Sequence, residues 1–242
     1  MSVPARQPGK RSRSTRPRAR RLALLALLAL VAMLLAPTGA SAASKATSAA
    51  PCPTSGGIPF SSTLSNGTVT IGKHAKATGT SGSACGLVTF DPNVGLVSTI
   101  AQDNISFNPF ILHVGILAVP TQMTAVSDFH GTVSGNPDGT TNITLTGSVN
   151  ATSSILGFKC TIGPITPTLT TGTSGSLTGQ PLVGQLPGPL TGKLVANDFA
   201  VPKATASRSC PKLIAALVNL TVGLPQPPGG SSLTADVSLT TS

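Results

Sequence analysis

The sequence lacks several residue types on which common binding and catalytic sites depend. It has no tryptophan and no tyrosine, so the flat aromatic faces on which sugars usually stack are absent. It has no glutamate either, and all six acidic residues are aspartates. Glycoside cleavage needs two carboxylates placed around one sugar, whereas these aspartates are scattered, and Asp91 and Asp138 adjoin turn-forming residues. Composition therefore argues against glycoside chemistry.

The N-terminus carries half of the positive charge. Eight of the 16 lysines and arginines precede Ala43, and none of the six acids does. An apolar run from Leu22 to Ala36 follows the basic stretch, and it is shorter than the ~20 residues that span a bilayer. A proline, a glycine and the small residues Ala40-Ser41-Ala42 complete the pattern of a secretory signal peptide. We predict that residues 1–42 are this signal, cleaved between Ala42 and Ala43; a retained single-span anchor is the alternative.

Removal of the signal changes what the charge implies. The remaining chain has eight basic and six acidic residues, a net charge of +2. Non-specific phosphate binding needs many lysines and arginines on one face, so we expect no nucleic-acid partner. We also expect that no stable membrane span remains after processing. The mature protein is then secreted, and it is either extracellular or associated with the cell wall.

The four cysteines predict two disulfide bonds. Their number is even and the chain is predicted to be exported, which favours disulfides over free thiols. Three connectivities are possible, and we prefer the sequential pairs Cys52–Cys85 and Cys160–Cys210. A metal site would need C-x-x-C spacing or interleaved histidines, and the sequence has neither, so no metal or other cofactor is expected.

The pattern after the signal is that of short antiparallel strands. Apolar and polar residues alternate, with one dry and one wet face, in segments 67–73, 142–149 and 232–241. Turn-forming residues at 66–67, 135–139 and 227–230 separate such segments. We predict an all-β fold, an antiparallel β-sandwich or barrel-like arrangement, with residues 59–242 as a single domain and residues 43–58 as a flexible leader attached through Cys52.

Two segments depart from this alternation. Residues 110–119 are almost continuously apolar, which predicts a strand buried on both faces, with His113 as a hydrogen-bonded core residue. In the second, Leu213, Leu217 and Leu220 recur at helical spacing after Pro211. This spacing predicts one short helix over residues 211–219 that packs against one end of the β-domain.

The candidate catalytic residues are few. A serine nucleophile of the G-x-S-x-G type is absent. Asp128 and His130 lie two residues apart, so on a strand they point the same way and the carboxylate could orient the imidazole. The non-functional alternative is that these two residues lie at a solvent-exposed strand end. In addition, the sequence does not single out a nucleophile among its many serines and threonines. We therefore expect no catalytic residues and a protein that is not an enzyme.

Residues 156–242 combine four features: a cysteine that opens a strand, G-x-L-T-G segments, an F-x-V-P…C-P turn before a short helix, and a final alternating strand. In this combination the chain resembles the secreted Thr/Gly-rich β-domain proteins of actinobacteria, and the Ala/Arg/Leu-rich signal fits the same group. The resemblance implies an exported β-domain and carries over no site residue.

Three functions follow from these observations. The first is a non-enzymatic structural or interaction protein of the cell envelope or extracellular space, with cell-wall components as partners. The second is a carrier that holds an apolar, lipid-like molecule in the interior of the β-domain. A carrier should contain an enclosed apolar cavity of several hundred cubic ångströms, whereas a packed core would exclude it. The third is a hydrolase that uses His130 and Asp128, which needs a hydroxyl near His130.

Overall fold

The computed structural model describes residues 51–93, 95–114, 121–126, 128–153, 157–185 and 187–241. All of them belong to one compact unit, Thr47–Ser242. The predicted signal peptide, its cleavage site at Ala42 and Ala43, and residues 43–50 of the predicted leader lie outside the described residues. Within the described part of the chain, no helix is both long enough and apolar enough to cross a membrane.

The described residues fold into antiparallel strands and one α-helix. The elements in chain order are β1 (Ile58–Ile71), β2 (Ala75–Asp91), β3 (Gly95–Ile100), the 3-10 helix η1 (Gln102–Asn104), β4 (Ile105–Phe107), β5 (Phe110–Val114), β6 (Thr121–Ala125), β7 (His130–Gly135), β8 (Thr141–Ser153), β9 (Phe158–Ile165), β10 (Thr168–Thr170), β11 (Thr173–Ser174), β12 (Leu177–Thr178), β13 (Gln180–Val183), β14 (Leu190–Ala196), β15 (Ala204–Thr205), α2 (Lys212–Val222) and β16 (Ser231–Thr241). Every pairing between these strands is antiparallel. The predicted antiparallel all-β fold with one short helix is confirmed.

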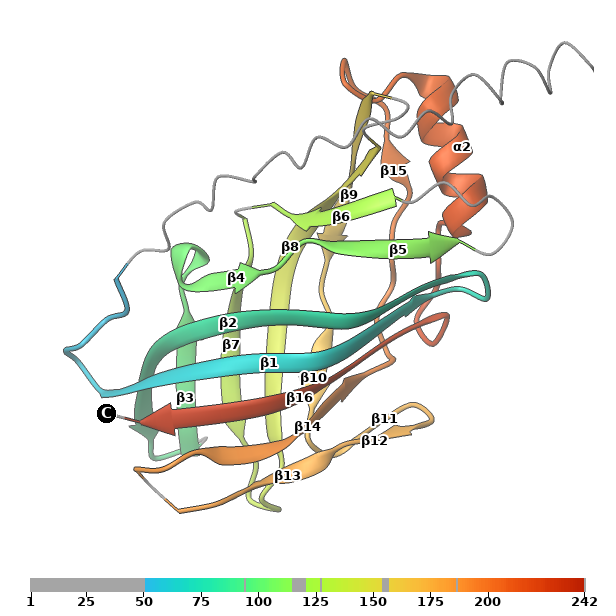
Figure 1. The fold of residues 1–242 in the computed structure, drawn as a ribbon. Helices are drawn as coiled ribbons and strands as arrows, with labels where there is room; N and C mark the ends of the chain where they lie inside the picture. Colours follow the sequence, from blue (N-terminus) through green and yellow to red (C-terminus); the bar gives the residue numbers. More distant parts are fainter. Residues whose placement is uncertain are drawn as a thin grey trace, which may run out of the picture. The chain divides into compact units, whose positions relative to one another are not determined.

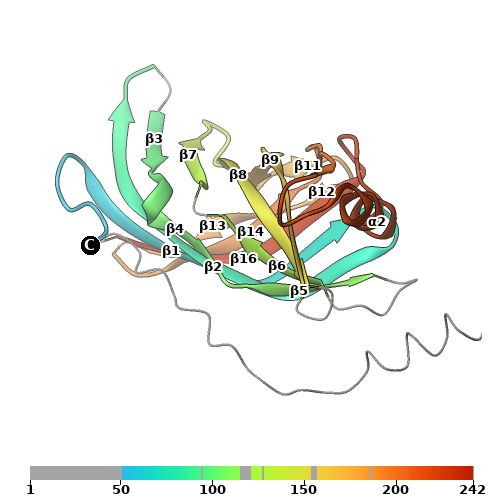
Figure 2. The same cartoon turned by 90° about the horizontal axis from the view of Figure 1, so that it is seen from above.

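The strand pairings close into a ring. From β1 they run through β16, β14, β10, β8, β6, β5 and β2, and β2 pairs again with β1. Strands β3 and β7 connect β2 to β8 by a second route, and β9 pairs with β8 and β15. Figures 1 and 2 show the ring from two directions. Each strand of the ring therefore has one face toward a shared interior.

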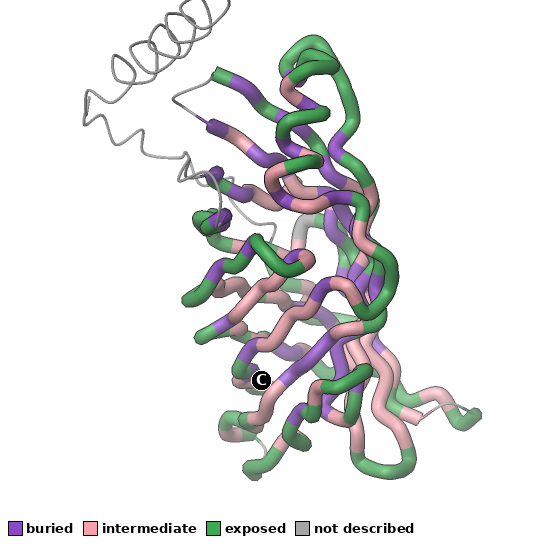
Figure 3. The backbone as a smooth tube through the Cα atoms, turned by 90° about the vertical axis from the view of Figure 1, so that its right-hand side faces the viewer, coloured by how far each residue is buried: buried purple, intermediate pink, exposed green. Residues whose placement is uncertain are grey.

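The alternating segments place their apolar residues as predicted. Along β16, Leu233, Ala235, Val237 and Leu239 share the face that lines the interior of the ring. Along β8, Ile143, Leu145 and Val149 do the same. Figure 3 shows buried and exposed residues succeeding one another along the strands. This is the two-residue period of a sheet with one dry face.

The Asn66-Gly67 pair does not form the predicted turn. Asn66 has φ 50° and lies inside β1, where the register with β16 shifts between Ser65 and Thr68. A positive φ is one that asparagine tolerates better than most residues. The pair therefore makes a bulge that lets β1 continue, and the strand begins at Ile58, earlier than the alternating segment suggested.

The predicted turn at residues 135–139 joins β7 to β8. The Oδ1 of Asp138 accepts hydrogen bonds from the hydroxyl of Thr140 at 2.6 Å and from its backbone N–H at 2.9 Å. These bonds, the hydroxyl's first, hold the pKa of the Asp138 carboxyl below its ordinary value. The Asp138 carboxylate therefore stabilises the turn in which it lies, as is common for aspartate in such positions.

Strand β5 corrects the prediction of a doubly buried strand over residues 110–119. In its described part, Leu112 and Val114 are buried, whereas Ile111 and His113 are exposed. β5 pairs with β6 on one edge and with a short stretch of β2 on the other, and the face that carries Ile111 and His113 is open to solvent. His113 is therefore a surface residue and not the predicted core residue. The apolar run suggested burial on both faces because it includes Ile111, which is exposed.

Helix α2 is longer than the predicted helix and presents a different face. It runs on to Val222 and ends at Gly223, whose φ of 82° makes a left-handed cap. Asn219 lies inside the helix, and its side chain is bonded to both backbone polar groups of Ala204. The buried residues are Ala215, Val218 and Val222, facing β15 and β9. Leu213, Leu217 and Leu220 are exposed.

Both predicted disulfides are present. Cys52 pairs with Cys85 and Cys160 pairs with Cys210, so no described cysteine is free. The first ties the irregular segment before β1 to β2, and the second ties β9 to the residue two before α2. Two disulfides indicate an oxidising, extracellular environment.

Candidate functional site

An apolar cavity lies inside the ring of strands. Its volume is about 120 Å³. It is lined by Leu64, Val69, Ile71, Thr80, Ser81, Phe107, Asn108, Phe110, Met123, Ala125, Phe129, Leu145, Val149, Ile162, Ile165, Pro167, Leu169, Phe199, Val201, Leu233 and Ala235. None of these described residues is charged, and all but three are apolar. The cavity is smaller than the several hundred cubic ångströms that the sequence-based carrier hypothesis required.

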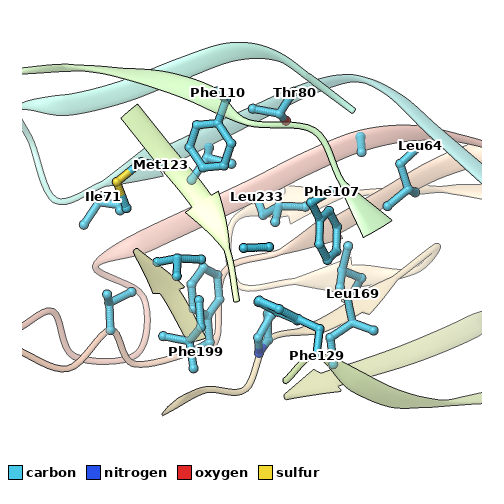
Figure 4. A pocket seen from close by; sticks show the side chains of 18 of the residues that line it. Leu64, Ile71, Thr80, Phe107, Phe110, Met123, Phe129, Leu169, Phe199 and Leu233 are labelled. Atoms are coloured by element: carbon cyan, nitrogen blue, oxygen red, sulfur yellow. The ribbon is translucent and has the colours of Figure 1, made fainter. Parts of the chain in front are cut away.

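The lining comes from strands around the ring and from four connections between strands. Lining residues come from the strands β1, β2, β4, β5, β6, β8, β9, β10 and β16. The connections before β5, before β7, before β10 and after β14 contribute Asn108, Phe129, Pro167, and Phe199 with Val201. The rings of Phe107 and Phe129 meet edge to face, with centroids 5.2 Å apart at 66°. Figure 4 shows the labelled side chains converging on one space. The cavity is thus built by the fold as a whole.

Polar residues gather at one place on the lining. Of the described lining residues, Asn108 alone is exposed, and Thr80 and Ser81 beside it are half-buried. The Asn108 side-chain amide donates to the Ser81 hydroxyl at 2.8 Å, and its backbone N–H donates to the Ser81 carbonyl at 2.9 Å. β2 pairs with β4 at 82–84 and with β5 at 75–76, so the ladder is interrupted here. The lining therefore reaches the exposed surface at Asn108, and we refer to Thr80, Ser81 and Asn108 as the mouth of the cavity.

A second, smaller cavity adjoins the first. Its volume is about 40 Å³, and it shares Leu64, Phe107, Leu145 and Leu169 with the larger one. The shared side chains form the partition between the two spaces.

The predicted catalytic pair does not form a carboxylate–imidazole contact. The Oδ1 of Asp128 accepts a hydrogen bond from the backbone N–H of Ser148 at 2.9 Å. The Nδ1 of His130 lies 3.0 Å from the backbone carbonyl oxygen of Asp128, not from its carboxylate. Within the described residues, no serine or threonine hydroxyl is bonded to this imidazole. Asp128 is therefore a structural acceptor, and His130 lies at the start of β7, exposed to solvent.

The two other histidines lie on the surface of the described structure. His74 lies in the exposed β1–β2 turn and His113 on the exposed face of β5. No group of three histidine, cysteine or acidic residues in the described segments is close enough to hold a metal ion. Neither His74 nor His113 lines the apolar cavity.

Replacement of Gly147 by alanine is expected to destabilise the cavity wall. Gly147 is buried on β8, and an added β-carbon would overlap the ring of Phe129, which is itself buried against Phe107. Overpacking of this kind costs about 1–3 kcal/mol. Urea unfolding of Gly147→Ala measures the loss.

Gly135→Ala is the matched control for this variant, because a β-carbon there meets Leu96 at an ordinary 3.8 Å. We expect its free energy of unfolding to stay within about 0.5 kcal/mol of the parent value. Equal losses in the two variants would contradict the packing argument for Gly147.

Sequence reasoning identified part of this site. The alternating segments located the inward residues of β8 and β16, but not the mouth, because Thr80, Ser81 and Asn108 resemble the many other polar residues of the chain. The resemblance to actinobacterial β-domain proteins stays a prediction. No protein-family model matches the chain, and no curated protein and no solved structure matches it.

Proposed function

We propose that this is a secreted binding protein that holds the single apolar chain of an amphipathic, lipid-like molecule inside the ring of strands. The chain occupies the cavity, and an uncharged polar head group lies at Thr80, Ser81 and Asn108. The observation that carries the proposal is a cavity with an almost wholly apolar lining. Among the described lining residues, the only exposed one is the polar Asn108.

The chemistry of the lining selects the ligand. An apolar cavity of similar size, about 150 Å³, stays free of water and binds small apolar molecules. The apolar side chains of the lining have no neighbouring atoms on the side that faces the empty space. A ligand chain in the cavity would make dispersion contacts with them. The absence of charged groups among the described lining residues disfavours an ionic ligand, because an unpaired charge would lose its hydration.

The volume limits the size of the ligand. About 120 Å³ is below the 300–1,000 Å³ of pockets for drug-sized molecules. A branched or multi-chain lipid would not fit in it. One chain fits, and it can extend into the second cavity where Leu64 and Phe107 form the partition.

The same volume weighs against the purely structural function. An empty cavity destabilises a protein by roughly 24 cal/mol per Å³, which gives about 3 kcal/mol here. A protein selected only as an inert scaffold would gain stability by filling the space. A structural or interaction role in the envelope stays a prediction from sequence, whereas the cavity favours ligand binding.

The test uses the protein that begins at Ala43. 4-(Dimethylamino)benzonitrile, a small uncharged dye with a single ring, should change its fluorescence on binding to one saturable site, and straight-chain alcohols should displace it more effectively as their chains lengthen. Native mass spectrometry of gently purified protein should show an adduct. A protein without adduct that leaves the dye fluorescence unchanged would overturn the proposal.

The mouth can be tested separately from the cavity. Asn108→Leu should weaken displacement by the alcohols and leave binding of the dye almost unchanged, because the dye lacks a hydroxyl head group. Equal weakening for both would mean that Asn108 shapes the cavity and does not bind the head group.

A further inference from the structure

Helix α2 carries an apolar stripe on its exposed side. Leu213 and Leu220 are each 80% exposed, and Leu217 is 39% exposed. Their spacing of four and three residues puts them on one face, opposite the buried Ala215 and Val218. Helices on the surface of a globular protein usually turn polar residues outward. This helix is apolar on both sides, and one of them is unoccupied in the described structure.

Four exposed basic residues lie on β9, in the segment that leads into α2, and at the start of the helix itself. Lys159, Lys203, Arg208 and Lys212 are all exposed. Lys159 is held beside Ser209 by two hydrogen bonds and by the neighbouring Cys160–Cys210 disulfide. Lys203 adjoins Ala204, whose backbone is bonded to Asn219 of the helix. These contacts place the backbone of Lys159 and Lys203 beside the helix, Lys212 is its first residue, and Arg208 precedes it by four residues.

The charge of this region differs in sign from that of the rest of the domain. Segments 157–165 and 199–224, which form β9, β15 and α2, contain these four basic residues and no acid. All six aspartates lie elsewhere, where the chain after residue 42 has four lysines. The helix region thus has a charge of +4, and the remainder has a charge of −2. Such asymmetry points to an acidic partner surface.

We propose that the exposed side of α2 docks on an anionic lipid surface. Leucines in an apolar stripe insert at the boundary between head groups and acyl chains, while flanking lysines and arginines bind acidic head groups. A second copy of this chain is a poor occupant, because docking stripe to stripe would bring two sets of four positive charges together. This surface is separate from the cavity lining and does not depend on the ligand proposed above.

The test measures binding to vesicles by co-sedimentation. The protein again begins at Ala43, because residues 1–42 carry eight basic residues that would bind anionic vesicles by themselves, and residues 47–242 form a compact unit of their own. Binding to phosphatidylglycerol–phosphatidylcholine vesicles should exceed binding to pure phosphatidylcholine by at least about tenfold. It should fall when salt is raised from about 0.1 M to about 1 M.

Two variants examine the two parts of the surface. Leu213→Gln/Leu217→Gln/Leu220→Gln keeps side-chain length and helix propensity and should weaken binding at least about tenfold. Changing Lys159, Lys203, Arg208 and Lys212 to glutamine should abolish the preference for the anionic lipid. Should the first variant fail to fold, the second still decides, because its residues are exposed and their side chains have no described packing role.

The matched control is Phe90→Gln/Leu96→Gln. These two residues face each other across β2 and β3, are 73% and 55% exposed, and adjoin Asp91; Figures 1 and 2 show β3 and α2 on opposite sides. This variant should bind vesicles as the parent does. The proposal is overturned if the leucine variant binds normally, if the control loses binding equally, or if the stripe causes self-association in sedimentation velocity and no vesicle binding.

Discussion

Ala235→Leu is expected to weaken binding of an apolar ligand more than tenfold while leaving the protein at least as stable as before. Ala235 is buried on β16 and lines the cavity. The added carbons would occupy space within the roughly 120 Å³ now available. Each methylene of a ligand is worth about 0.8 kcal/mol when buried, so excluding two of them costs about 1.6 kcal/mol, which exceeds tenfold in affinity.

The predicted rise in stability distinguishes this variant from ordinary core damage. Filling an existing cavity commonly adds about 0.5–2 kcal/mol to the free energy of unfolding. A variant that loses binding because it misfolds would lose stability as well. Ala125→Leu, at the end of β6 on the same lining, should behave in the same way.

The measurements are dye binding and urea unfolding on the same preparations. Ala101→Leu makes the same substitution at an exposed position outside the lining and should change neither. Normal affinity in both filled variants would show that ligands bind elsewhere. Lower affinity together with a loss of more than about 1 kcal/mol would show that the space is occupied by side chains and that the leucine overpacks it.

The strands that sequence predicted best are those whose environment is uniform along their length. β16 has one face toward the ring interior and the other toward solvent from end to end, so alternation of Leu233, Ala235 and Val237 with polar residues gives its orientation directly. β8 is similar. The sequential disulfides, preferred among three possible connectivities, are also present.

The failures have a common physical origin. Residue type reports burial only on average, and exposed apolar residues are common on protein surfaces. Ile111 made β5 look buried on both faces, and the three leucines of α2 outweighed the smaller Ala215 and Val218 that in fact pack inward. At Asn66-Gly67, the same local preference for positive φ serves either a turn or a bulge, and only the partner strands decide between them.

The cavity was beyond reach of the sequence for another reason. An empty space is the difference between the volume that a ring of strands encloses and the volume of the side chains that fill it. Phe129 and Phe199 reach the interior from connections whose path depends on the whole ring. The sequence indicated that the interior is apolar, and the tertiary arrangement decides how much of it is empty.

Removing the Cys160–Cys210 disulfide is expected to lower the free energy of unfolding by about 4 kcal/mol. The two cysteines are 50 residues apart and fully buried. The chain-entropy model for a loop of this length gives about 4.1 kcal/mol. Both halves of the loop are ordered in the native state, at β9 and at the start of α2, so the reduced native protein gains little freedom that would offset the effect.

Cys52–Cys85 is the natural comparison. Its separation of 33 residues gives about 3.7 kcal/mol in the same model, yet Cys52 lies in an exposed, irregular segment before β1. When this bond is absent, residues 51–57 gain freedom in the native state as well, which offsets part of the gain of the unfolded state. We therefore expect Cys52→Ala/Cys85→Ala to lose clearly less stability than Cys160→Ala/Cys210→Ala.

Denaturant unfolding of the two double variants, with hydrogen exchange on each, checks this expectation. The Cys160→Ala/Cys210→Ala protein should show faster exchange in residues 203–224, because α2 and β15 then depend on the Asn219–Ala204 bonds and on the contact of Val218 and Val222 with β9 and β15. Equal losses in the two variants would show that native-state freedom of the leader is unimportant. A loss below about 1 kcal/mol at Cys160–Cys210 would mean that the packing of α2 holds this region without the covalent bond.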